Sequence, residues 1–229
     1  MLGELWFAEG FTSYYPPLFI RRAGIADDGD YVKKISRVIN TVIKAPGRRF
    51  FSPVEMSMQA PFVDAAVSID PKNSDNTFIS YYDWGSVIGL GLAFILCTRF
   101  HTTLNDYMRV VWFAHGQTER PYTLADLERV LGETVGDAVF AADFFRRHIN
   151  ETEVMDYVAL LANGGHLLRR ANSGAAWIGA NILSQGGGAQ SLARLLSSAV
   201  RSMKPASKRE WSCGKSMALR FRAQRTLMT

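Results

Sequence analysis

The sequence predicts a mainly α-helical protein that ends in a short β segment and a basic tail. Apolar residues recur at helical spacing through residues 1–163. At Gly164-Gly165 the pattern changes to short strand-like runs, and Gly186-Gly187-Gly188 then opens a segment rich in Ser, Ala and Arg. We therefore divide the chain into a helical part (1–163), a short β segment (164–188) and a tail of low order (189–229).

The composition is that of a globular protein with one sizeable core. The chain has 229 residues, of which 48% are hydrophobic. Its longest apolar stretch, Val87 to Cys97, would span only roughly 16 Å as a helix, about half a bilayer core, so we expect a buried helix and no membrane partner. No N-terminal stretch has the pattern of a signal peptide. Cys97 and Cys213 are too few for a disulfide framework and are expected to be free thiols.

The positive charge is concentrated in the tail. The formal net charge is +5, yet residues 189–229 hold nine Lys or Arg against one acid, Glu210, so the rest of the chain is mildly acidic. A nucleic-acid-binding arm is the weaker interpretation of this tail, because its only interleaved aromatic residues are Trp211 and Phe221. We expect no nucleic-acid partner.

The first helices are marked by caps and prolines. We expect an opening helix from Leu5, kinked or broken at Pro16-Pro17, which lack two backbone donors. An apolar stripe follows Asp27-Asp28 and stops before Pro46-Gly47. Ser52-Pro53-Val54-Glu55 has the cap, first-turn proline and reaching glutamate of a helix that should end near Ala65.

A polar loop at 70–76 leads to the apolar helix, expected from Ser80 to Cys97, in which Gly85, Gly89 and Gly91 should permit close helix contact. Thr103 should cap the next helix, and Thr123 another, with Asp126 returning a hydrogen bond to the cap. In the helix after Thr103, five residues are expected to pack inward: Leu104, Tyr107, Val110, Val111 and Phe113. Two further helices are expected, one with Phe140, Phe144 and Phe145 that ends near Asn150 and one at 154–162. Short strands are expected at 166–170 and 175–178.

The four histidines show no metal-ligand spacing. No two of them stand four residues apart, and no pair of cysteines at ligand spacing accompanies them. The simplest interpretation of His101, His115 and His148 is a surface or helix-end position. We expect nothing in this chain to bind a metal ion unaided.

The most specific motif is Trp6-Phe7-Ala8-Glu9-Gly10-Phe11-Thr12-Ser13-Tyr14-Tyr15. It resembles the third-ligand helix of gluzincin metallopeptidases, in particular the glycyl aminopeptidase family. In that family the glutamate is the third protein ligand of a catalytic zinc, and an upstream His-Glu-x-x-His helix supplies two histidines and the general base. The resemblance therefore implies that Glu9 is a zinc ligand.

A second motif, Asn76-Thr77-Phe78-Ile79-Ser80-Tyr81-Tyr82-Asp83-Trp84-Gly85, is similar to the family pattern Asn-Thr-x-Ile-Ser-Tyr-Tyr-x-Lys-Gly. Related enzymes use the tyrosine two places before the lysine to donate a hydrogen bond to the oxyanion, which implies a catalytic role for Tyr82. A buried structural tyrosine is the other interpretation of this position. Trp84 departs from the family lysine, and Pro16-Pro17 could shift the helix of Glu9.

The resemblance covers about residues 2–180 and implies the helical C-terminal subdomain of a gluzincin catalytic domain, joined to the start of a PDZ-like module. Only Met1 to Leu5 precede the first motif, so we expect a fragment with one of three zinc ligands, inactive alone. The complete enzyme would be a zinc aminopeptidase that removes small N-terminal residues, such as glycine, from peptide substrates. A frame shift would explain the sequence after Gly186. The alternative function is a non-catalytic helical module that binds peptides or proteins.

Overall fold

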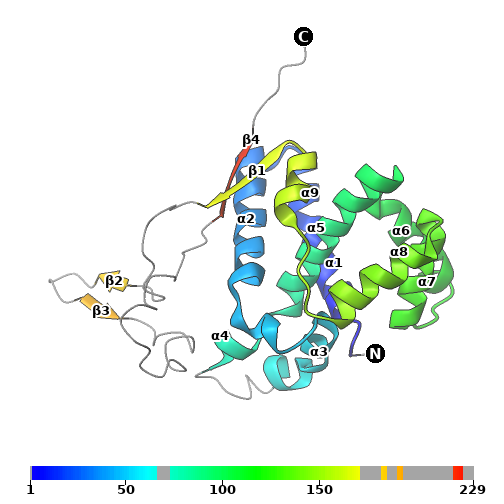
Figure 1. The fold of residues 1–229 in the computed structure, drawn as a ribbon, viewed down its shortest axis with the longest axis horizontal. Helices are drawn as coiled ribbons and strands as arrows, with labels where there is room; N and C mark the ends of the chain where they lie inside the picture. Colours follow the sequence, from blue (N-terminus) through cyan, green and yellow to red (C-terminus); the bar gives the residue numbers. More distant parts are fainter. Residues whose placement is uncertain (1, 66–72, 171–181, 185–189, 193–218, 224–229) are drawn as a thin grey trace, which may run out of the picture.

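The computed structural model describes residues 2–65, 73–170, 182–184, 190–192 and 219–223, and these are mainly helical (Figure 1). The first helices, with the short helical segments between them, are α1 (Leu5–Arg22), α2 (Asp28–Lys44), η1 (Pro46–Arg49), α3 (Pro53–Met58), η2 (Pro61–Ala65), α4 (Ser74–Thr77) and α5 (Tyr81–Phe100). They are followed by α6 (Leu104–Val111), η3 (Trp112–Gly116), α7 (Leu124–Val135), α8 (Ala138–Phe145), η4 (Arg146–Asn150) and α9 (Tyr157–Asn163). The strands are β1 (His166–Arg170), β2 (Ile182–Ser184), β3 (Gln190–Leu192) and β4 (Leu219–Ala223).

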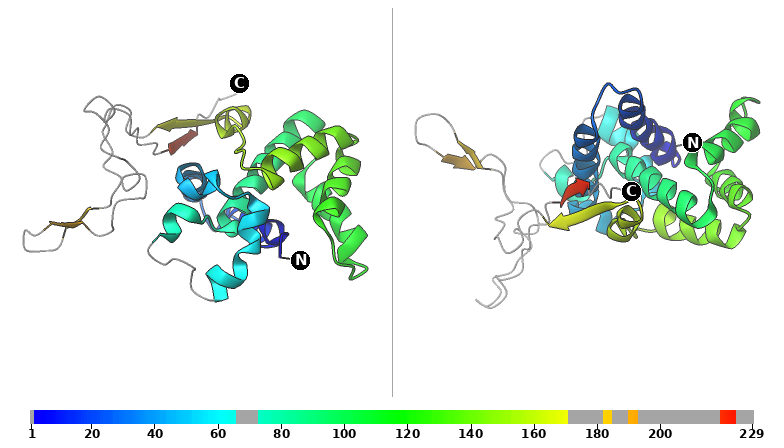
Figure 2. Two further views of the ribbon diagram at one scale, coloured as in Figure 1. Left: turned by 60° about the horizontal axis from the view of Figure 1, so that its bottom comes forward. Right: turned by 90° about the horizontal axis from the view of Figure 1, so that it is seen from above.

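Helix α5 runs through the centre of the helical part, with α1, α2 and α9 packed around it and α6 to α8 gathered at one end (Figures 1 and 2). Among the described residues it is the one helix long and apolar enough to cross a membrane, but 56% of its apolar window is buried within the protein. Most of its residues from Tyr81 to Leu92 are buried, which confirms the predicted buried helix. It extends three residues beyond the predicted end and closes at His101, whose φ of 51° is left-handed.

The closest packing in the fold is between α1 and α5. A Cβ added at Gly10 would lie 2.4 Å from the Gly85 Cα, and one added at Gly85 would lie 1.9 Å from the Trp6 carbonyl oxygen. The two backbones therefore touch at a pair of glycines, as predicted for Gly85. Around this contact Trp6, Phe7 and Phe11 of α1 pack edge-on or tilted with ring centroids 4.5–6.1 Å apart.

The predicted caps are confirmed. The side chains of Ser52, Thr103 and Thr123 each accept a hydrogen bond from the backbone N–H three residues later, and the backbone N–H of each cap residue donates to the carboxylate at that later position, which completes a capping box. At Thr123 the Asp126 carboxylate accepts from the Thr123 N–H at 3.0 Å, while the Asp126 N–H donates to the Thr123 Oγ1 at 3.2 Å. These bonds satisfy backbone donors that the first turn of each helix leaves unpaired.

Replacing Thr123 with Ala should lower the free energy of unfolding by about 1 kcal/mol, because it removes the acceptor of an N-terminal backbone N–H of α7. Chemical denaturation monitored by circular dichroism measures this loss. Thr98→Ala is the control, because the Thr98 hydroxyl only donates to the Phe94 carbonyl within α5 and caps nothing. An equal loss in both variants would contradict the capping role.

Three helical predictions were wrong in detail. A kink or break was predicted at Pro16-Pro17, and the break is wrong: helix α1 continues to Arg22, because its packing against α5 and α2 outweighs two missing hydrogen bonds. The helix that begins after Ser52 ends at Met58, and a separate π-helical turn, η2, continues to Ala65. The predicted polar loop contains the short helix α4, while residues 66–72 lie outside the described part of the chain.

The stripe on α6 also differs from the prediction. Leu104, Tyr107 and Val111 are buried, but Phe113 is 57% exposed. At about 100° per residue, position 113 lies opposite this stripe, whereas His115 continues it four residues after Val111. His115 is accordingly buried, and so is His148, whose Nδ1 lies 2.9 Å from the Glu153 carbonyl oxygen. The prediction for these two histidines was a surface or helix-end position: both are buried, so the surface position is wrong, but both lie in the last turn of a helical segment.

The C-terminal strands form two small antiparallel pairs. β1, at the predicted residues, follows α9 and pairs with β4, with His166 opposite Ala223. β2 pairs with β3. The predicted strand at 175–178 and most of the predicted low-order tail lie outside the described residues. Helix α8 and η4 reach Asn150 as predicted, and α9 begins three residues later than expected, after its cap Asp156.

Candidate functional site

Glu9, the predicted zinc ligand, stands next to the glycine contact on α1. It is half-buried, and its charge, with that of Glu4, contributes to the raised pKa of Tyr122, which burial raises most. The negative charge of Glu9 is therefore close enough to Tyr122 to affect the ionisation of its hydroxyl. Its backbone carbonyl accepts a hydrogen bond from the Thr12 hydroxyl at 2.9 Å.

Tyr82, the predicted catalytic tyrosine, lies in the first turn of α5, three residues before Gly85. Its side chain is 39% exposed, and its ring stacks on that of Tyr81 with centroids 4.9 Å apart. Tyr81 is the buried member of the pair, with 2% of its surface exposed. Tyr82 is therefore not the buried residue that the alternative interpretation of this position expected.

The departure at Trp84 does not alter the surface around Tyr82. Two residues apart on a helix are separated by about 200°, so Trp84 and Tyr82 lie on opposite faces of α5. Trp84 is 2% exposed and belongs to the core. The family lysine at this position is replaced here by an apolar contact within the core.

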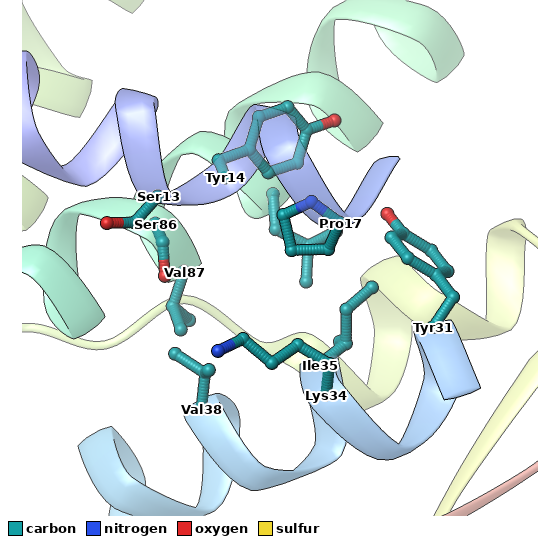
Figure 3. A pocket seen from close by; sticks show the side chains of 10 residues that line it. Ser13, Tyr14, Pro17, Tyr31, Lys34, Ile35, Val38, Ser86 and Val87 are labelled. Carbon is teal, nitrogen blue, oxygen red and sulfur yellow. The ribbon is translucent and has the colours of Figure 1, made fainter. Parts of the chain in front are cut away.

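A small pocket of about 30 Å³ lies where α1, α2 and α5 meet (Figure 3). Ser13 stands one turn after Glu9, and Ser86 one turn after Tyr82, and both line this pocket. Lys34 of α2 lines the opposite wall, and Figure 3 shows its side chain extending along the pocket toward Ser86 and Val87. The pocket thus continues the α1–α5 seam on which the two motif residues stand.

Two cations of α2 act on the residue next to Tyr82. Burial raises the pKa of Asp83, while Arg37 and then Lys34 oppose this rise through their positive charge. Within the parts of the chain that are described, neither Arg37 nor Lys34 has an ion-pair partner, whereas Lys33 pairs with Asp30 at 3.4 Å. The first turn of α5 therefore lies in a positive electrostatic environment.

A larger apolar groove of about 870 Å³ lies between α1 and η3. Phe11 and Phe19 of α1 line one side, and Trp112, His115 and Tyr122 line the other. Both ring nitrogens of His115 are buried and without a hydrogen-bond partner among the described residues, and its Nε2 lies 4.0 Å from the Asp126 carboxylate.

The described residues do not by themselves fit a zinc ion. A protein zinc site needs at least three fixed ligands, and no group of three His, Cys, Asp or Glu side chains in this part of the chain is close enough to hold a metal. Glu9 is a chemically suitable single ligand.

Two features of this region were not predicted from the sequence. Lys34 and Arg37 were not singled out, because their role depends on α2 packing beside α5, which has no local signal. The buried position of His115 did have one, since it extends the spacing of Leu104, Tyr107 and Val111.

Comparisons with known proteins agree with this architecture. A sequence model of the M61 glycyl aminopeptidase family matches residues 1–88. The structure is similar to that of an aminopeptidase N family protein from Idiomarina loihiensis, with a TM-score of 0.72 and 24% sequence identity over 86% of this chain. The match covers 35% of that protein, so the chain spans about a third of its length. No curated protein matches significantly.

The fold is therefore that of part of an aminopeptidase structure. The N-terminal region, which contains both motifs, matches the model of the M61 glycyl aminopeptidase family. M61 is a family of zinc peptidases, whose substrates are peptides.

Proposed function

We propose that this chain is part of a zinc-dependent aminopeptidase in which Glu9 is one metal ligand and Tyr82 donates a hydrogen bond to the substrate oxyanion. The other ligands would come from a His-Glu-x-x-His helix outside this sequence. The residues from 164 onward would begin a PDZ-like module, and the division at 163 and 188 remains our proposal.

The observation that supports this function most is the contact of α1 with α5 at Gly10 and Gly85. Glu9 is adjacent to Gly10, and Tyr82 stands less than one helical turn before Gly85, so both motifs meet at the same crossing. The half-buried carboxylate and the accessible phenol suit their proposed roles, because a ligand must be held in place and an oxyanion donor must be reachable.

A fusion protein tests the function directly. The upstream half of an M61 family member, including its His-Glu-x-x-His helix, is joined to residue 2 of this chain. We expect about one zinc per molecule by mass spectrometry and hydrolysis of glycyl-p-nitroanilide. A folded fusion without zinc and without hydrolysis would contradict the peptidase function and favour the alternative, a non-catalytic module that binds peptides or proteins.

In this fusion, Glu9→Gln should weaken zinc binding by more than about 100-fold, since even the loss of an outer-shell partner costs ~10–100-fold in metal affinity. Zinc affinity is measured by competition with a chromophoric chelator. Glu128→Gln on α7 is the matched control and should leave zinc binding unchanged. Equal zinc affinity in the Glu9 variant would show that this carboxylate is not a ligand.

A further inference from the structure

Four basic residues form one face of α2 and the turn that follows it. Lys34, Arg37 and Lys44 fall within an arc of about 80° on the helix, and Arg48 follows in η1. We call this set the α2 cationic stripe. From Lys34 to Lys44 it is roughly 15 Å long, the length of four or five residues of extended peptide.

The stripe passes the first turn of α5, where Tyr82 stands. Lys34 and Arg37 both act on the Asp83 carboxylate, and Lys34 lines the pocket with Ser13 and Ser86 (Figure 3). At the other end, a Cβ added at Gly47 of η1 would lie 2.8 Å from the Thr77 backbone, just before α5 begins. Both ends of the stripe therefore lie near the start of α5, the helix that carries Tyr82 in its first turn.

The charge of the stripe is only partly compensated. Among the described residues, Lys34, Arg37 and Lys44 have no ion pair, and the Arg48 Nε donates to the Ile43 carbonyl rather than to a carboxylate. Burial lowers the pKa of Lys44, and burial followed by repulsion from Arg49 lowers the pKa of Arg48. Among the described residues, both Lys34 and Arg37 act on the single carboxylate of Asp83, so at this point two positive charges face one negative charge.

We propose that the α2 cationic stripe binds carboxylate groups of a peptide at the candidate site, so that the site favours acidic residues after the N-terminal residue. This inference rests on the proposed function, since it takes Glu9 and Tyr82 as the end of the site that receives the peptide N-terminus. Extended peptide places successive side chains ~3.3 Å apart, so two neighbouring carboxylates can meet Lys34 and Arg37 together. Contacts between exposed charges of this kind are individually weak, so the expected preference is a modest change in affinity.

Peptide binding to the chain as it exists tests the proposal without zinc or turnover. Two peptides that carry a dye at the C-terminus, Gly-Asp-Asp-Gly-Lys-amide and its isosteric Asn-Asn counterpart, are compared by fluorescence anisotropy. We expect the acidic peptide to bind about fivefold to tenfold more tightly at low salt, and the difference to vanish at ~0.5 M salt. Equal binding of the two peptides at low salt would overturn the proposal.

The double variant Lys34→Gln/Arg37→Gln should bring the affinity ratio of the two peptides close to one. Lys33→Gln is the matched control, because Lys33 is paired with Asp30 and lies outside the stripe, and it should keep the preference. A preference that survives the double variant would overturn the proposal. So would binding to vesicles of 30% phosphatidylserine that depends on Lys34 and Arg37 without any preference for the acidic peptide.

The two proposals fail separately. If the fusion protein binds no zinc but the peptide preference depends on Lys34 and Arg37, the peptidase function is contradicted and the stripe is still a peptide-binding surface. If the fusion protein contains zinc and is active but the two peptides bind equally, only the proposal about the stripe is contradicted.

Discussion

Gly85→Ala should lower the free energy of unfolding by about 3 kcal/mol or more and the melting temperature by roughly 6–12 °C. The new Cβ would lie 1.9 Å from the Trp6 carbonyl oxygen and 2.7 Å from the Gly10 Cα, so it would meet backbone rather than a flexible side chain. Helices α1 and α5 would have to separate along their length. Thermal and denaturant unfolding monitored by circular dichroism measure the effect.

Gly89→Ala on the same helix is the control for this experiment. Its Cβ would lie 3.4 Å from the Phe11 ring, an ordinary contact, and alanine favours a helix over glycine by up to ~1 kcal/mol. We therefore expect Gly89→Ala to be neutral or slightly stabilising. If both variants have melting temperatures close to that of the unmodified chain, α1 and α5 do not touch at Gly85.

Tyr82→Phe, in the fusion protein described above, should lower kcat by about 10²–10³ with little change in KM. The substitution keeps the ring that stacks on Tyr81 and removes only the hydroxyl proposed to meet the developing oxyanion. Zinc content should stay the same, because the proposed role of the phenol concerns the substrate rather than the metal. Steady-state hydrolysis of glycyl-p-nitroanilide measures both parameters.

Tyr15→Phe provides the comparison. The Tyr15 hydroxyl donates to the Asn105 side chain at 3.1 Å on the surface, on a different face of α1 from Glu9, and its loss should change kcat less than twofold. If both variants keep full activity, the proposed role of Tyr82 is wrong.

Local sequence signals predicted the helices well wherever short-range hydrogen bonds decide the structure. The caps at Ser52, Thr103 and Thr123 follow from side chains three residues apart, and all three are present. The predicted mainly helical fold and the close approach at Gly85 are likewise confirmed. These features need no knowledge of distant residues.

The wrong predictions are those that tertiary packing decides. Two prolines suggested a kink or break in α1, but the helix continues through Pro16-Pro17, and the rings of Tyr15 and Phe19 stack across them with centroids 5.2 Å apart. Phe113 was placed in the core for its hydrophobicity alone, against the helical spacing that puts His115 there. For the candidate site, the sequence motifs predicted Glu9 and Tyr82, and their roles stay predictions.

The two prolines have a consequence for how α1 opens. Proline has no N–H, so the carbonyls of Thr12 and Ser13 lack their usual amide donors. Fewer backbone hydrogen bonds therefore connect the C-terminal part of the helix to its N-terminal part. Phe19 and Ile20, beyond the prolines, are largely exposed, whereas Trp6, Phe7 and Phe11 are buried. Local unfolding should therefore start at Arg22 and stop at the prolines, so the turn that carries Glu9 stays folded while the end of the helix fluctuates.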